Sequence, residues 1–136
     1  GETGNALDSP LAVLFMADPL TLGRRAEAKA LELLRLTGWR LLDRNWRCRW
    51  GELDLVLEKD RRLLVVEVKG RSSRFCSNRG VAAFNQRKRR CLAKAISCWR
   101  ADHPEAERQQ LQVVLALVPL CGRCTGVRWL PVDQLG

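Results

Sequence analysis

Two carboxylates and one lysine interrupt two neighbouring runs of residues that favour β-strands. Asp54 lies in the run Gly51–Leu57, and Glu67 and Lys69 belong to the run Leu63–Lys69. Charged groups within an apolar strand cost free energy unless they are paired or bind a metal ion. Two adjacent carboxylates repel each other unless a cation lies between them, and their oxygen atoms suit Mg²⁺ or Mn²⁺. These residue types predict a divalent-metal site formed by Asp54 and Glu67, with Lys69 at its edge.

The two runs are joined by a polar link that is typical of a β-hairpin. A two-residue turn at Asp60-Arg61 places Asp54 directly across from Glu67, with their Cβ atoms roughly 5 Å apart on one face. The same register places Glu52 across from Lys69, and a slip of one residue would break the arrangement. Such residues also form surface cross-strand ion pairs, which contribute little to stability. The spacing alone leaves both interpretations open.

The charge of the chain is concentrated directly after this hairpin. The net charge is +9 and the pI is near 10.0, yet residues 68–100 carry ten bases and no acid, so the remaining residues sum to −1. Such a segment favours a polyanionic partner, nucleic acid before a membrane surface. Beside it, the metal chemistry predicted is phosphodiester hydrolysis, with Lys69 orienting water or stabilising charge on the phosphate. The candidate phosphate contacts are Arg44, Arg47, Arg71, Arg74, Arg87, Lys88, Arg89 and Arg90.

A helix over residues 21–37 is predicted to cover the sheet, capped by Thr21 and ended by Gly38. Its apolar stripe at helical spacing is formed by Ala26, Ala30, Leu33 and Leu34. Glu27 lies at the edge of the stripe, where it either reaches inward to the sheet or pairs in solvent with Arg24.

The other expected elements are three strands and one further helix. Residues 39–50 predict a strand with bases between tryptophans, which either binds nucleic acid or packs its tryptophans inward at a sheet edge. A helix is expected over residues 85–100, and strands over 111–118 and 127–130. The element order is therefore α-β-β-β-α-β-β, with residues 1–20 as an N-terminal tail and 21–136 as a single domain.

Several other classes of protein are not indicated. No secretory signal or membrane-spanning run is recognisable, so a cytoplasmic protein with reduced thiols and no membrane partner is expected. Cys121 and Cys124 have zinc-knuckle spacing, but a structural site needs two more ligands, so no zinc is expected. The chain has a single histidine, and neither a serine-centred triad nor a glycine-rich phosphate loop is present.

The hairpin residues also belong to a wider set of motifs. Asp54 followed by Glu67-Val68-Lys69 resembles the D…(D/E)xK signature of the restriction-endonuclease-like superfamily. A set of blocks in this order resembles the YraN family, small bacterial proteins similar to archaeal Holliday-junction resolvases: Gly23–Ala30, Arg44–Arg47, Gly51–Val56, Val66–Lys69 and Arg71–Ser73. The match spans about residues 22–135. Gln110–Gln112 and Arg87-Lys88 depart from the family pattern.

The resemblance implies an α/β fold with a restriction-endonuclease-like core, a mixed sheet of about five strands flanked by helices. It assigns Asp54 and Glu67 to the metal, Lys69 to catalysis and Glu27 to an auxiliary catalytic acid. It implies a nuclease acting on structured or branched DNA, and a homodimer by similarity to resolvases. The alternatives are a non-catalytic nucleic-acid-binding protein on this fold, associated with RNA or ribosomes, and an adaptor whose basic helix docks on an acidic protein.

Overall fold

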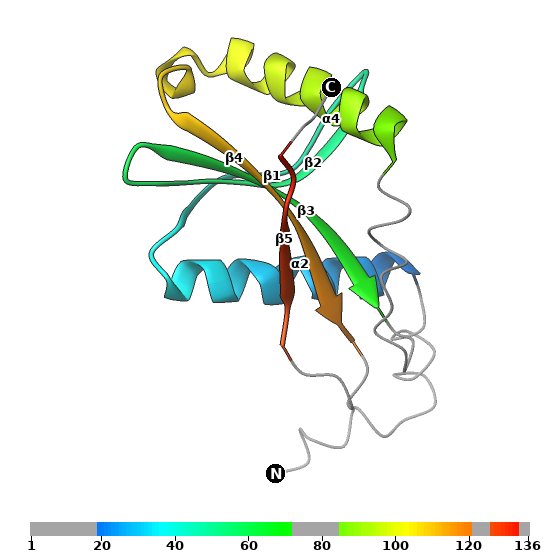
Figure 1. Ribbon diagram of the computed structural model, residues 1–136. Coiled ribbons are helices and arrows are strands. Elements are labelled where there is room, and N and C mark those ends of the chain that lie inside the picture. The colour runs from blue at the N-terminus through cyan, green and yellow to red at the C-terminus, as the bar shows by residue number, and fades with distance from the viewer. Residues whose placement is uncertain (1–18, 72–84, 121–125, 134–136) are drawn as a thin grey trace.

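The computed structural model describes residues 19–71, 85–120 and 126–133, which form a five-stranded sheet with one long helix on each face (Figure 1). The strands lie in the order β1-β2-β3-β4-β5, and only β3 and β4 run parallel, so the sheet is mixed. The elements are α2 (Pro19–Leu36), β1 (Arg40–Cys48), β2 (Gly51–Lys59), β3 (Arg62–Arg71), α4 (Gln86–Asp102), η2 (Pro104–Ala106), β4 (Gln110–Pro119) and β5 (Arg128–Pro131).

The predicted α-β-β-β-α-β-β order is confirmed, with a short 3₁₀ turn added after α4. The mixed sheet between two helices is consistent with the restriction-endonuclease-like core that the family resemblance implies. No helix in the described ranges combines the length and the apolar character needed to cross a bilayer. Most of the predicted N-terminal tail, residues 1–18, lies outside the described residues.

Helix α2 starts and ends for identifiable reasons. It begins at Pro19, which suits the first helical position because proline has no N–H to satisfy there, so Thr21 lies within the first turn and is not the cap. Gly38 ends the helix as predicted, with φ at 95°. Around it, the Trp39 N–H donates to the Leu34 carbonyl at 3.1 Å and the Gly38 N–H to that of Arg35 at 3.0 Å. These two bonds form a Schellman motif.

The apolar stripe of α2 is centred differently from the prediction. Leu31 is 4% exposed, whereas Leu33 is 36% exposed and lies on the outer side. At 100° per residue Leu33 falls beside Ala26 on the far edge of the stripe, while Leu31 falls on the side occupied by Leu34. The stripe packs with Leu55, Leu57, Leu64 and Val66 in one core, and α4 covers a second core on the opposite face.

The hairpin between β2 and β3 has the predicted turn and register. Asp60 and Arg61 have φ of 49° and 63°, which is the geometry of a two-residue type I′ turn. Pairing runs from Lys59↔Arg62 to Leu55↔Val66 and stops there. Beyond this pair β2 stays with β1 as far as Gly51, and β3 stays with β4 as far as Arg71. The sheet therefore splits between β2 and β3, at the position of the predicted carboxylates.

A close contact between α2 and β3 sets the position of the helix at this split. A Cβ at Gly70 would lie 3.2 Å from the Cβ of Ala26 and 2.7 Å from Cδ1 of Leu120. Ala26 is fully buried, so two small residues let the helix approach the strand closely. Glu27, the next residue on the helix, is thereby brought to the open end of the hairpin.

Candidate functional site

A cavity of about 300 Å³ occupies the place where β2 and β3 part. Because the sheet is split there, residues from helices on opposite faces reach the same space. The lining comes from α2, the β1–β2 turn, β2, β3 and α4 and comprises Gly23, Glu27, Trp50, Gly51, Glu52, Asp54, Glu67, Val68, Lys69, Lys88, Cys91, Leu92 and Ala95. All four residues predicted to be catalytic, Glu27, Asp54, Glu67 and Lys69, line this one cavity.

Asp54 and Glu67 take over hydrogen bonds that the strand ladder no longer makes. The Val68 N–H donates to Oδ2 of Asp54 at 2.8 Å, across the split from β3 to β2. The backbone N–H of Asp54 interacts in turn with the carboxylate of Glu67. The two side chains thus replace carbonyl groups as acceptors, which holds both carboxylates in place without closing the gap between the strands.

Burial disfavours the charged form of both carboxylates. It is the main cause that raises the pKa of Asp54 from 3.8 to about 6, and the charges of Glu27 and Glu52 add to it. Burial and the neighbouring Asp54 raise the pKa of Glu67 from 4.5 to about 8. Oε1 of Glu67 is buried and has no hydrogen-bond partner within the described part of the chain. Such an atom needs either a proton or a cation.

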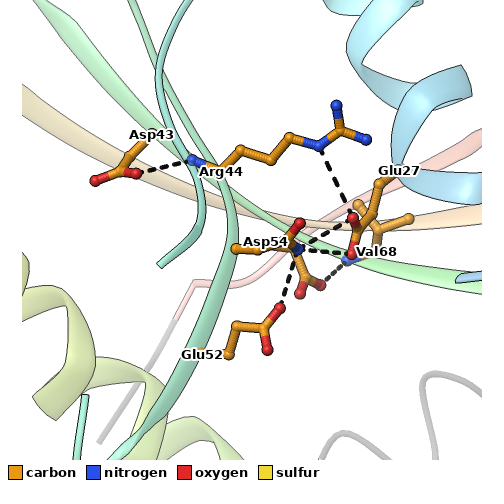
Figure 2. A network of polar contacts seen from close by, with 7 residues as sticks. Glu27, Asp43, Arg44, Glu52, Asp54 and Val68 are labelled. Atoms are coloured by element: carbon orange, nitrogen blue, oxygen red, sulfur yellow. Dashed lines mark hydrogen bonds and ion pairs between the residues drawn. The ribbon is translucent and has the colours of Figure 1, made fainter. Parts of the chain in front are cut away.

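Glu27 and Glu52 are joined by a single amide, that of Asn45 on β1. Its Nδ2 donates to both oxygens of Glu27 at 3.1 Å and to Oε1 of Glu52 at 3.0 Å. Nε of Arg44 lies 4.0 Å from Glu27, and Nε of Arg47 donates to Glu52 at 3.0 Å. Figure 2 shows Glu27, Glu52 and Asp54 turned toward one another from α2 and β2. Glu27 therefore reaches inward and is not paired with Arg24.

The predicted partner of Glu52 is wrong. Ladder pairing ends before Glu52 would reach Lys69, because β2 has left β3 at that point. Glu52 instead bonds with residues of its other neighbour, β1. This brings its carboxylate beside those of Glu27 and Asp54, with one oxygen of each residue within 4.8 Å of the others.

The carboxylate oxygens suit a hard divalent cation. Mg²⁺ and Mn²⁺ prefer oxygen ligands, and the partnerless Oε1 of Glu67 is an oxygen that the described residues leave unsatisfied. The sequence favours Asp54 and Glu67 as ligands. The tightest grouping of acids is Glu27, Glu52 and Asp54, so Glu52 is a further candidate ligand.

Two lysines lie beside the carboxylates. Lys69 of β3 and Lys88 of α4 both line the cavity. Contact with the Lys69 amine lowers the pKa of Lys88, and partial burial and like-charge repulsion act in the same direction, opposed by Glu67 and Asp54. Asn85 caps α4 by accepting from the Lys88 N–H at 3.0 Å, which sets the first turn of the helix. The cavity thus combines acids from three elements with two amines.

The residues predicted to contact nucleic acid lie in different environments. Arg44 and Arg47 are exposed but already neighbour acids, whereas Arg87 and Arg90 are exposed on α4. Arg89 is half-buried on that helix, and Arg71 is the last residue of β3. Arg74 lies outside the described residues, as do Cys121 and Cys124.

Asn45 is the site residue that sequence reasoning missed. Its φ of 52° is left-handed, a conformation that asparagine tolerates better than most residues. It lies at the position opposite Asp54 in the β1–β2 register, where no ladder pair forms. A lone polar residue in a basic strand gives no sign of such a bridge. The only available signal was its place inside one of the motif blocks.

Comparison with known proteins gives one consistent family. The model of the uncharacterised protein family UPF0102 matches residues 26–116. A UPF0102 protein of Synechococcus sp. (strain CC9902) is 63% identical over 113 residues, 83% of this chain and 93% of the relative. One from Prochlorococcus marinus (strain MIT 9303) is 50% identical over 109 residues, 80% and 86% of the two chains. One from Bordetella avium (strain 197N) is 45% identical over 94 residues, 69% and 64%. This chain belongs to the UPF0102 family, the YraN family whose motifs its sequence resembles.

Proposed function

We propose that this protein is a divalent-metal-dependent nuclease that hydrolyses phosphodiester bonds in structured or branched DNA. The observation that supports it is the meeting of four carboxylates and two lysines in one cavity at the split between β2 and β3. An acidic cavity on a chain of net charge +9 suits a metal and a polyanion together. Neither the acidic cavity nor the positive net charge alone would favour hydrolysis over simple binding.

The acids have distinct roles in this proposal. Asp54 and Glu67, supported by Glu52, would hold Mg²⁺ or Mn²⁺, which when bound supplies an activated water and polarises a phosphoryl oxygen. Glu27 reaches the cluster from α2, and its bonds to Asn45 fix its orientation. It acts as the auxiliary acid that orients a water molecule. The raised pKa values of Asp54 and Glu67 mean that a cation competes with protons there, so activity rises with pH.

The lysines act on the phosphate. Lys69 follows Glu67 by two residues and faces the same cavity, so its ammonium group can stabilise the charge that develops on the phosphoryl oxygens. Lys88 reaches the cavity from α4, which lies on the opposite face of the sheet from α2. Two amines from different elements orient the phosphate more tightly than one, because they can contact two of its oxygens at once.

The rival function is nucleic-acid binding without cleavage, and one observation favours it. The Asn45 amide already donates hydrogen bonds to Glu27 and Glu52. Arg47 pairs with Glu52 and Arg44 lies 4.0 Å from Glu27, so arginines partly neutralise two of the four acids without any metal ion. On this alternative the acids orient the basic side chains as a scaffold.

An isosteric substitution separates the two functions. Wild type and Asp54→Asn are incubated with Mn²⁺ or Mg²⁺ and a labelled four-way junction, duplex or single strand, and the products are resolved on gels. We expect metal-dependent cleavage by the wild type, strongest on the junction, and a loss on the order of 10²-fold or more in the variant. Asp133→Asn, an exposed carboxylate near the end of the described chain, is the matched control and should cleave normally.

Binding without metal-dependent cleavage by any of the three proteins would contradict the nuclease and favour the scaffold. Association that does not weaken with salt would contradict both, because phosphate contacts release counterions, and would favour a protein partner for the basic helix.

A further inference from the structure

Trp50 holds two cations at the rim of the acidic cavity. Cζ of Arg49 lies 4.7 Å from the centre of the indole, and Nζ of Lys94 lies 4.1 Å from it. Both distances are within the range of a cation–π interaction. Arg49 comes from the β1–β2 turn and Lys94 from α4, so the ring joins two elements that are distant in sequence. Both cations therefore lie against the same indole ring.

Within the described part of the chain, neither cation forms an ion pair with a carboxylate. The ion pairs among the described residues join Arg40, Arg44 and Arg47 to acids, and none of them includes Arg49 or Lys94. Both side chains are exposed, and Arg90 adds a third exposed base one turn before Lys94 on α4. Like charges one turn apart on a helix destabilise it. An anion bound beside these cations offsets their mutual repulsion.

The position of the Trp50 ring is fixed by packing against the core. Trp50 is half-buried and packs against the core under α4, and it also lines the cavity that contains Asp54 and Glu67. The next residues, Gly51 and Glu52, begin the wall of the acidic cluster. The indole and its two cations therefore lie beside the cavity that contains the carboxylates.

We propose that Arg49 and Lys94, oriented by Trp50, bind the backbone phosphate adjacent to the one at the carboxylates. This inference rests on the proposed function, since nucleic acid at the cavity is what brings a second phosphate to the rim. Trp50 is a positioning residue: its π-face holds an arginine and a lysine that would otherwise separate. The ligand is a polynucleotide, because a molecule with one phosphate cannot fill both places.

Binding without turnover tests the subsite. Fluorescence anisotropy of a fluorescein-labelled 20-nucleotide single strand is measured in EDTA across a series of salt concentrations. Arg49→Gln and Lys94→Gln should each weaken binding about tenfold at low salt and reduce the slope of log K against log salt by roughly 0.7. Lys29→Gln removes the same charge from the exposed side of α2, on the other face of the sheet, and serves as the matched control.

Trp50 is tested by two substitutions. Trp50→Leu leaves both charges on the chain, so it should lose only part of the affinity that the Arg49→Gln/Lys94→Gln double variant loses. Adding that pair to Trp50→Leu should cost less than it costs the wild type, because the cations are then no longer held in place. Trp50→Phe keeps a π-face and should restore most of the affinity. If circular dichroism shows that Trp50→Leu does not fold, the binding of Arg49→Gln and Lys94→Gln decides whether the phosphate subsite exists.

The outcomes separate this inference from the nuclease proposal. Affinity and salt slope equal to those of Lys29→Gln would overturn the subsite, even if the wild type cleaves DNA with Mn²⁺. A loss confined to Arg49, Trp50 and Lys94 variants would support it, even if no protein cleaves. Absence of any binding by the wild type in EDTA would overturn the subsite, while the nuclease proposal would still be decided by the cleavage assay with Mn²⁺ and the junction.

Discussion

The two ends of the β2–β3 hairpin differ in backbone pairing and in burial. At the turn end every residue from Lys59↔Arg62 to Leu55↔Val66 is paired, and the apolar side chains of Leu55–Leu57 and Leu63–Val66 are buried in cores on both faces. At the open end the strands part, and carboxylates accept the backbone bonds that a ladder would have made.

The difference shows how one hairpin provides both stability and a polar cavity. The paired end is a rigid base that fixes the direction of both strands. The open end can hold acids whose charged forms are disfavoured by burial, because packing of the paired end fixes the positions of both strands. Four substitutions or conditions test this division, two at each end.

The largest expected effect is at the paired end. Leu57→Ala removes a fully buried side chain from the core under α2 and should lower the free energy of unfolding by about 2–5 kcal/mol. Urea denaturation measures the loss. Leu36→Ala, at a position 77% exposed, should change it by less than about 0.5 kcal/mol. Equal effects of the two substitutions would mean that the paired end is not the rigid base.

At the open end, the metal-free protein should lose stability as pH rises. In the unfolded chain Glu67 releases its proton near pH 4.5, whereas the folded chain keeps it up to about pH 8. The folded form therefore binds more protons across this interval, and unfolding becomes easier as pH increases. Asp54 adds a smaller loss between pH 3.8 and about 6. Together they should lower the free energy of unfolding by about 2–4 kcal/mol between pH 5 and pH 8.

Thermal melts in EDTA over this pH range measure the effect. Glu67→Gln should flatten the curve above pH 6, while Glu32→Gln, exposed on α2, should leave it unchanged. Adding Mn²⁺ at pH 8 should raise the melting temperature of the wild type more than that of Glu67→Gln, since ligand binding stabilises the folded state. A wild-type curve that rises toward pH 8 would contradict the assigned pKa directions.

A smaller effect is expected where α2 touches the open end. Gly70→Ala places a methyl group 3.2 Å from the Ala26 Cβ, and α2 must move because the contact is to a short side chain. We expect a loss of about 1–3 kcal/mol and weaker metal affinity, since Glu27 moves with the helix. Scanning calorimetry measures the loss of stability, and titration calorimetry with Mn²⁺ measures the metal affinity. Gly23→Ala meets nothing within 4 Å and should stabilise the helix by up to about 1 kcal/mol.

The smallest effect is expected at the turn. Arg61 has a φ of 63°, which glycine adopts without strain, so Arg61→Gly should stabilise the protein by about 0.5–1 kcal/mol. The backbone carbonyl of residue 61, which accepts from the Gln110 N–H, is retained. The urea midpoint should rise with an unchanged slope. A lower midpoint would show that the arginine side chain, not the turn geometry, dominates at this position.

Much of the fold followed from local patterns in the sequence. Gly38 ends α2 because only a residue at ease with positive φ closes that motif, and Asp60-Arg61 turns the hairpin because a two-residue loop sets the register. Leu33 was misplaced because spacing defines the width of a helical stripe but not the direction from which the sheet contacts it. The partner of Glu52 was misplaced because no local pattern marks where a ladder stops.

The sequence by itself determined the two strands, their turn and the residues that carry charge, since these depend on neighbours a few positions apart. The tertiary structure decided that the strands part beyond the Leu55↔Val66 pair, on the side of Asp54 and Glu67, and that Asn45 joins acids from α2 and β2. It also decided that Lys88 and Trp50 face the same cavity. The physical reason is that these contacts join separate elements. Their geometry depends on how two helices pack against a split sheet.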